Sequence, residues 1–407
     1  MNVGVLTAIV LGAAAQTEQD PPPPATNEAD LRRSDFRDFA ETDTITGSWW
    51  GHGDELAERG VTLTLNFWMV WQAVIEGGTD KDQGSTGEYR LAGHFDLERL
   101  AGIRGGGVFA RVDGGWSDPP DLTGIGAIMP VDGEFAVDSP AILTHLWYQQ
   151  NLFDTRLRLR FGLFTAADGM DFHGQTVAFD ANAYANFGGG QFLNSGLINN
   201  ASIHFPGTGS LGAAILAEPI ERVYVAAAIN NVNESRDFLD ALNLSSDWMV
   251  LVEAGVVPDF KLPGMYSIGF WHTSLPGSPS AQGVYLGMNQ LLHSEEPGDI
   301  QGLGMFARYG YADSSPDGVR NFWSLGGQYR GMFPTRDRDV AAIGWAQALT
   351  DGTSAFTAPY EGVLESYYRV RVTPWFFVTP MIQYIVNPGS TATRDAVVFS
   401  LRGQFVF

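Results

Sequence analysis

The chain contains no cysteine, and this absence limits its chemistry from the start. Disulfide bonds, thiolate metal sites and cysteine nucleophiles are all excluded. Charged residues are also scarce, at 17% of the chain against about 25% in an average soluble protein. Acidic residues outnumber basic ones by 46 to 24, so the formal net charge is −22. This excess of negative charge argues against nucleic-acid binding, which needs a basic face.

Long apolar runs are missing as well. No segment after the N-terminus is apolar enough to cross a membrane as a helix, for which about 20 residues are needed. A chain of this composition can span a membrane only as a closed β-barrel, because a barrel satisfies its own backbone hydrogen bonds. The length of 407 residues allows two or three soluble domains or one large barrel.

The first residues carry the features of an export signal. The run "VGVLTAIVLGAAAQ" is short and apolar and ends in small residues, which predicts a signal peptide over residues 1–15. An ordinary apolar segment is the alternative, because the usual basic residues before the run are missing. Four consecutive prolines follow, so we expect residues 16–45 to form a flexible, proline-rich segment. Residues 46–407 form the third predicted region.

A period of two recurs from Val61 to Phe407. In residues 61–72 every odd position is apolar, whereas Thr62, Asn66 and Gln72 lie at even positions. This alternation predicts half-buried β-strands, and turn-rich segments separate them. One short helix is predicted over residues 51–60, where Gly60 marks the end. The same alternation is found at residues 89–98, 156–163, 222–230 and 396–407.

Period two alone does not separate a soluble β-sandwich from a membrane barrel. Three features favour the barrel: arginines follow one another along the polar faces, aromatic residues gather near strand ends, and the chain ends on a strand at Phe407. We therefore predict an all-β, transmembrane antiparallel barrel. A soluble all-β protein with an aromatic-rich core is the alternative.

The stretch "ESYYRVRVTPWFFVTPMIQYIVNPG", residues 365–389, shows the alternation in detail. Its polar face predicts a lumenal surface, and its apolar face predicts contact with lipid. Pro374 fits a turn and Pro380 a strand entry, because proline donates no ladder hydrogen bond. The residues predicted to face the lumen are Glu365, Tyr367, Arg369 and Arg371, and those predicted to face lipid are Ser366, Tyr368, Val370 and Val372.

This stretch, together with "DAVVFSLRGQFVF" after it, resembles the C-terminal end of the carbohydrate-selective porin family (OprB-type) of Gram-negative outer membranes. The segments "TGSWWGHGDELAERGVTLTLNF" and "YRLAGHFDLERLAGIRGGGVF" resemble that family's start and early strand pair, although Ser48, Trp50 and His52 depart from its usual residues. The resemblance implies a barrel of about 16 strands with an N-terminal helix. It also implies passive diffusion of sugars and a monomer rather than a trimer.

We therefore predict an outer-membrane porin for glucose-like monosaccharides, with carbohydrate solutes and lipid as partners and no cofactor. Guanidinium and carboxylate groups can replace hydrogen bonds that a sugar loses with its hydration water. The alternative is that these groups pair with one another and stiffen the wall. The candidate substrate-binding residues are Arg90, Asp96, Glu98, Arg156, Arg158, Arg160, Glu365, Arg369 and Arg371.

Other functions stay open at this point. A general or ion-selective porin without a sugar site is one alternative, and a barrel with a plugged lumen is another. The segment 166–200 could fold inward as a constriction or remain an extracellular loop. Asp168, Asp171 and His173 are the nearest approach to a reactive or metal-binding cluster, but their spacing is generic. We predict no enzymatic activity.

Overall fold

The fold is described here from a computed structural model. It describes residues 43–120, 124–133, 138–165, 169–172, 175–177, 192–205, 209–232, 244–258, 261–275, 278–295, 301–314, 318–352 and 356–407. The predicted signal peptide and most of the proline-rich segment lie outside these residues, as do Asp168 and His173.

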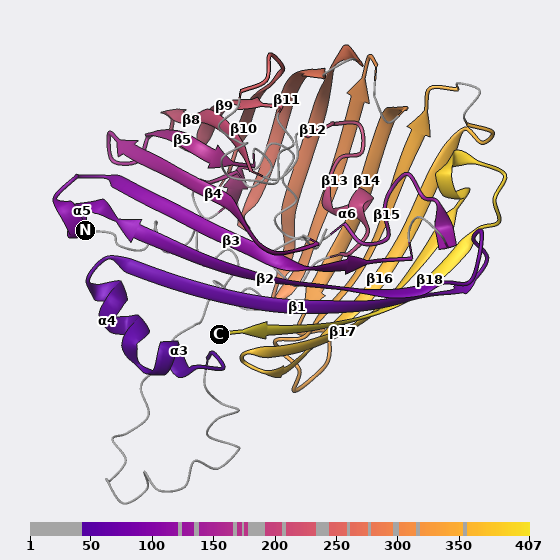
Figure 1. Ribbon diagram of the computed structural model, residues 1–407, viewed down its shortest axis with the longest axis horizontal. Coiled ribbons are helices and arrows are strands. Elements are labelled where there is room, and N and C mark those ends of the chain that lie inside the picture. Colours follow the sequence, from indigo (N-terminus) through magenta and orange to yellow (C-terminus); the bar gives the residue numbers. More distant parts are fainter. Residues whose placement is uncertain are drawn as a thin grey trace, which may run out of the picture.

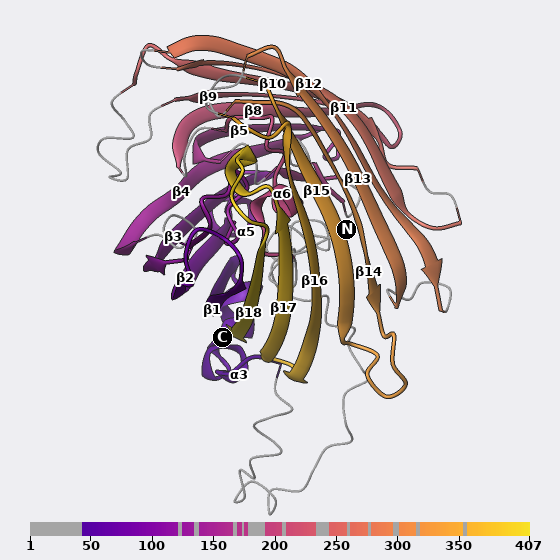
Figure 2. The ribbon, with the colours of Figure 1, turned by 90° about the vertical axis from the view of Figure 1, so that its right-hand side faces the viewer.

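Sixteen antiparallel strands form a closed barrel, which confirms the predicted fold (Figures 1 and 2). Each strand pairs with the next along the chain, and β1 closes the barrel against β18. The barrel strands are β1 (Val61–Glu76), β2 (Gln83–Asp96), β3 (Gly106–Asp118), β4 (Ser139–Leu152), β5 (Leu157–Phe164), β8 (Ser210–Ile220), β9 (Val223–Asn231), β10 (Trp248–Val256), β11 (Gly264–Leu275), β12 (Ser278–Ser294), β13 (Gly302–Ala312), β14 (Val319–Arg330), β15 (Val340–Thr350), β16 (Tyr360–Thr373), β17 (Phe376–Val386) and β18 (Ala396–Val406).

The alternation read from the sequence separates an inner face from an outer face. In β1, Met69 and Trp71 point outward and are 41% and 39% exposed, whereas Gln72 points inward and is 1% exposed. Successive side chains of a strand point to opposite faces, so this pattern extends along the strand. The predicted faces of β16 are confirmed in the same way: Glu365 and Tyr367 are buried inside, and Val372 is exposed outside.

Short elements lie outside the barrel strands. The predicted helix is confirmed as α4 (His52–Glu58), which follows α3 (Gly47–Trp50) and lies beside the start of β1 (Figure 1). Helix α5 (Leu97–Ala101) connects β2 to β3, the small hairpin of β6 (Met170–Phe172) and β7 (Gln175–Val177) follows β5, and η3 (Pro388–Ser390) follows β17. Among the helices described, none is long and apolar enough to cross a membrane.

Pro374 lies in the turn between β16 and β17, as predicted, but the prediction for Pro380 is wrong. Strand β17 begins at Phe376, so Pro380 lies in its interior. The pairing of β16 with β17 runs from Tyr367–Met381 to Val370–Val378 with no paired residues between them. Proline has no N–H to donate. Because the pairing with β16 is interrupted at this position, no donor is needed there and the sheet accommodates Pro380.

Two stretches of the connections at one end of the barrel lie within the lumen. The first comprises residues 124–133, between β3 and β4, and the second comprises residues 192–205, which include α6 (Ser195–Ile198). We call them the inner segments. Helix α6 lies inside the ring of strands in Figure 2. Of the two alternatives left open for residues 166–200, the inward course applies to residues 192–200, whereas the inward course of residues 124–133 was not predicted.

Candidate functional site

The two inner segments are joined to each other by their backbones. The Gly133 N–H donates to the Leu193 carbonyl at 2.7 Å, and the Ser195 N–H donates to the Pro130 carbonyl at 2.9 Å. Asn194 adds a side-chain hydrogen bond to the Met129 carbonyl at 3.1 Å. These bonds make the segments a single unit within the lumen.

Two carboxylates on the inward face of β16 hold this unit against the wall. Glu365 accepts from the backbone N–H groups of Leu193 and Asn194, both at 2.7 Å. Glu361 accepts from Ile128 at 2.8 Å and from Met129 at 2.7 Å. Both glutamates are fully buried. Because hydrogen bonds to charged groups are stronger than neutral ones, these two residues fix the position of the inner segments.

Polar side chains from other strands complete the attachment. Gln72 of β1 and Gln383 of β17 both donate to the Val131 carbonyl, at 3.1 and 2.8 Å. On the far side, Arg308 of β13 donates to the carbonyls of Ile198 and Gly196, at 3.0 and 3.1 Å. These contacts come from β1 and β17 on one side of β16 and from β13 on the other, so they prevent the unit from pivoting about a single contact.

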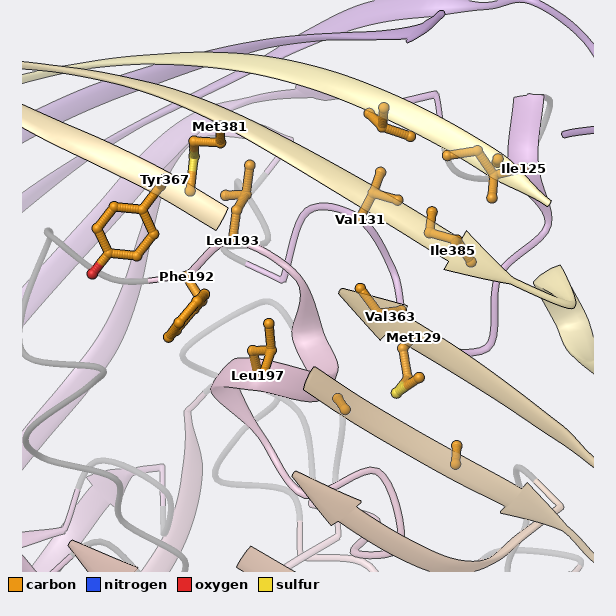
Figure 3. Packing of buried hydrophobic residues seen from close by; sticks show 14 of the residues in the cluster. Ile125, Met129, Val131, Phe192, Leu193, Leu197, Val363, Tyr367, Met381 and Ile385 are labelled. Atoms are coloured by element: carbon orange, nitrogen blue, oxygen red, sulfur yellow. The ribbon is translucent and has the colours of Figure 1, made fainter. Parts of the chain in front are cut away.

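Apolar packing fills the space between the inner segments and the wall. Ile125, Met129, Phe192, Leu193 and Leu197 are all essentially buried. They meet inward-facing side chains of β1 and of β13 to β18, as Figure 3 shows for part of the cluster. The wall residues of this cluster include Val70, Phe306, Phe322, Ala346, Val363, Tyr367, Met381 and Ile385. On β1 and on β13 to β18, the inward-facing apolar residues of this cluster therefore mark wall that is covered by the inner segments.

Three of the nine candidate residues are buried and form contacts with other parts of the protein. Glu365 anchors residues 193 and 194, as described above. Arg160 is 2% exposed, donates to Gln149 and to the Gly169 carbonyl, and stacks over Trp147 at 4.1 Å. Arg158 is 4% exposed and donates to the Thr155 carbonyl. These three residues therefore make structural contacts within the barrel.

Asp96, Glu98 and Arg156 do not lie along the lumen, which corrects the expectation for these three residues. Asp96 is the last residue of β2, and its carboxylate accepts from the first backbone N–H groups of α5. Glu98 is exposed on α5 itself, and Arg156 is exposed in the turn between β4 and β5. Strand alternation assigned them to the inner face. However, Asp96 is the end of β2, and Glu98 and Arg156 lie outside the strands.

Arg90, Arg369 and Arg371 lie on inward strand positions and keep contact with solvent. The Arg90 side chain is 36% exposed, pairs with Glu88 at 2.6 Å and stacks over Trp68 at 4.5 Å. Arg369 stacks over Phe377 at 3.6 Å. Stacking covers the aromatic faces, so Trp68 and Phe377 offer little surface to a sugar ring. It holds the guanidinium groups in defined planes and leaves their N–H groups for other partners.

The anchors Glu361 and Arg308 were not among the candidates. Glu361 lies two residues before Val363 and Arg308 two residues after Phe306, so strand alternation places both on the inner face. Within the described residues, no group of three or more His, Asp and Glu side chains is placed to hold a metal ion.

The comparisons with known proteins identify the family. Residues 80–278 and 276–407 match the family described as carbohydrate-selective porin, OprB family. The chain belongs to this family. It is thus a carbohydrate-selective porin of the outer membrane, a channel rather than an enzyme.

Individual proteins are similar to this chain in sequence or in fold. Porin B of Pseudomonas aeruginosa is 25% identical over 424 residues, which cover 89% of this porin and 91% of that protein. The high-pH structure of Pseudomonas putida OprB has a TM-score of 0.78 at 21% identity, over 90% of this chain and 99% of that one. The outer-membrane channel DcaP of Acinetobacter baumannii has a TM-score of 0.52 at 10% identity, over 85% and 97% of the two chains.

Proposed function

We propose that this porin passes glucose-like monosaccharides by passive diffusion, and that the sugar contacts Arg90, Arg369 and Arg371 as it passes the inner segments. One observation carries the proposal: the inner segments are fixed inside the barrel by Glu361, Glu365 and Arg308. A fixed obstruction narrows a channel to a defined size. Solvent-accessible guanidinium groups on the same wall supply donors that exchange with hydration water.

A swelling assay on liposomes that contain the refolded porin tests the proposal. We expect glucose to enter faster than a disaccharide, because the anchored segments limit the size of the solute. Replacement of both Arg90 and Arg369 by Gln should change the ratio of the glucose and disaccharide rates. Arg156→Gln removes the same charge at an exposed turn and is the matched control. Equal rates for both sugars in the wild-type porin would contradict a selective channel and favour a general porin.

We further propose that residues 1–15 are a signal peptide, that the exposed outward side chains of the barrel contact outer-membrane lipid, and that the porin is a monomer. The outward exposure of Met69, Trp71 and Ile75 supports lipid contact, since their large apolar surface needs an apolar environment. Native mass spectrometry in detergent measures the oligomeric state. A trimer mass would overturn the proposal of a monomer.

A further inference from the structure

Arginines gather on the inward face of the barrel beyond the inner segments. Arg330 of β14 pairs in register with Val340, and Val340 pairs with Arg369 of β16, so the two arginines lie in one row across three strands. Arg371 is two residues farther along β16, about 7 Å away on the same face. Arg402, Arg330 and Arg371 are close enough to Arg369 for their like charges to act on it.

Two carboxylates of this part of the wall, Glu365 and Asp339, bind partners other than the arginine side chains of the row. Both oxygens of Glu365 accept backbone N–H groups of the second inner segment. Asp339 accepts from Arg336 and from the Tyr368 hydroxyl, and it meets Arg371 only through the backbone N–H. Asp43 is the acidic residue whose charge acts on the Arg371 guanidinium. Among the described residues, no salt bridge joins Arg369 or Arg371 to an acid.

Three polar atoms at this place are left without a hydrogen-bond partner among the described residues. They are Nε of Arg369, Nε of Arg371 and the hydroxyl of Tyr367. Tyr367 is 3% exposed, and Figure 3 shows its hydroxyl pointing away from Leu193 and Leu197. The remaining bond of the Arg369 guanidinium, from Nη2 to Gln404, is long at 3.4 Å. Buried polar atoms are normally hydrogen-bonded, so these groups are placed to bind a ligand or water that reaches this part of the lumen.

We propose that Arg369 and Arg371, with Tyr367 beside them, form a site for the carboxylate or phosphate group of an acidic sugar. This inference rests on the proposed passage of sugars along the same wall. Guanidinium groups bind carboxylate and phosphate oxygens through paired N–H donors, and stacking of Arg369 on Phe377 presets one of the two planes.

Glucuronate and glucose form a matched pair of probes, because they share a ring and differ by a carboxylate at carbon 6. Single-channel conductance in a planar bilayer at about 0.1 M salt, where the screening length is about 10 Å, measures the block by each. We expect glucuronate to half-block the channel at a concentration about tenfold below that of glucose, as about 1.4 kcal/mol of added binding gives. Block by glucose 6-phosphate in the same range would extend the site to phosphate.

The double variant R369Q/R371Q should lose the tenfold preference for glucuronate, and R156Q should keep it. If the double variant does not fold, as judged by heat-dependent mobility on a gel, R371Q alone should reduce the preference. The inference is overturned if the wild-type channel blocks equally with glucuronate and glucose, if acetate blocks as well as glucuronate, or if folded R369Q/R371Q keeps the preference. Glucose entry into liposomes is measured in parallel, since its absence would refute the proposed function itself.

Discussion

Along the inward face of β16, Glu361, Val363 and Glu365 are fully buried, whereas Arg369 and Arg371 farther along the same strand keep contact with solvent. All five residues share one strand and one face. The first three are covered because the backbone N–H groups of the inner segments bind the two glutamates. Burial inside this barrel therefore depends on what folds over a wall position, in addition to the side of the strand it occupies.

Glu365→Ala should most strongly reduce the difference between the two halves of β16, because it uncovers the buried half. It leaves the N–H groups of Leu193 and Asn194 without an acceptor, at a cost of about 1–3 kcal/mol for each. We expect a larger single-channel conductance and faster entry of a disaccharide into liposomes. Glu58→Ala, at an exposed position of α4, is the control. Unchanged conductance in folded Glu365→Ala would show that the segment holds without this anchor.

Leu197→Ala tests the apolar contribution to the same attachment. Leu197 is fully buried in the cluster between the second inner segment and the wall. Loss of a buried leucine costs about 2–5 kcal/mol. Hydrogen exchange of peptides from residues 192–205 should speed up, while exchange of the barrel strands stays slow. Leu100→Ala, at a leucine that is 46% exposed, should leave the rate unchanged. Equal protection in both variants would contradict a packing role for Leu197.

Arg308→Lys should have a smaller effect on the far side of the unit. Lysine keeps the charge but lacks the planar fork that reaches the carbonyls of both Gly196 and Ile198. We expect a loss of about 1 kcal/mol in the attachment, as for one hydrogen bond. Noise in the open-channel current should rise as the segment moves. Arg156→Lys provides the comparison, and a quiet open channel in Arg308→Lys would argue against the contact.

Arg371→Gln tests the half of β16 that keeps contact with solvent. We expect it to have the smallest effect on stability. A partly exposed side chain away from the packed unit contributes within about 0.5 kcal/mol. The heat resistance of the barrel should therefore be unchanged. The reversal potential in a salt gradient should shift toward cation preference, because a lumenal positive charge is lost. Lower heat resistance with an unchanged reversal potential would show that Arg371 contributes to the stability of the barrel and not to the charge of the lumen.

The sequence was informative about the barrel because strand alternation is a local property. Trp68 and Trp71 are three residues apart, and their positions in the alternation alone place one inside and one outside. The terminal strand and the helix at residues 52–58 followed from equally local signals. Pro380 was misplaced because a proline at a strand entry and a proline at a gap in the ladder look alike in a single sequence.

The site was harder to predict because it depends on contacts between distant residues. Glu365 contacts residues 193 and 194, which lie about 170 positions earlier, so no window of sequence reveals that this carboxylate is an anchor. Nor could alternation show where a strand ends, and Asp96 was assigned to the lumen although it caps a helix. For residues 124–133, the apolar side chains Ile125, Met129 and Val131 within a connection were the available signal of an inward course.

The inner segments are attached to the wall through their main-chain N–H and carbonyl groups. The wall residues that form these hydrogen bonds include Glu361, Glu365, Gln383 and Arg308. Every residue except proline offers the same N–H, and every residue offers the same carbonyl. A mutation in an inner segment can therefore alter the profile of the opening while its attachment survives. Single substitutions in the inner segments can therefore change which solutes pass during evolution, while the barrel and the attachment of the segments stay the same.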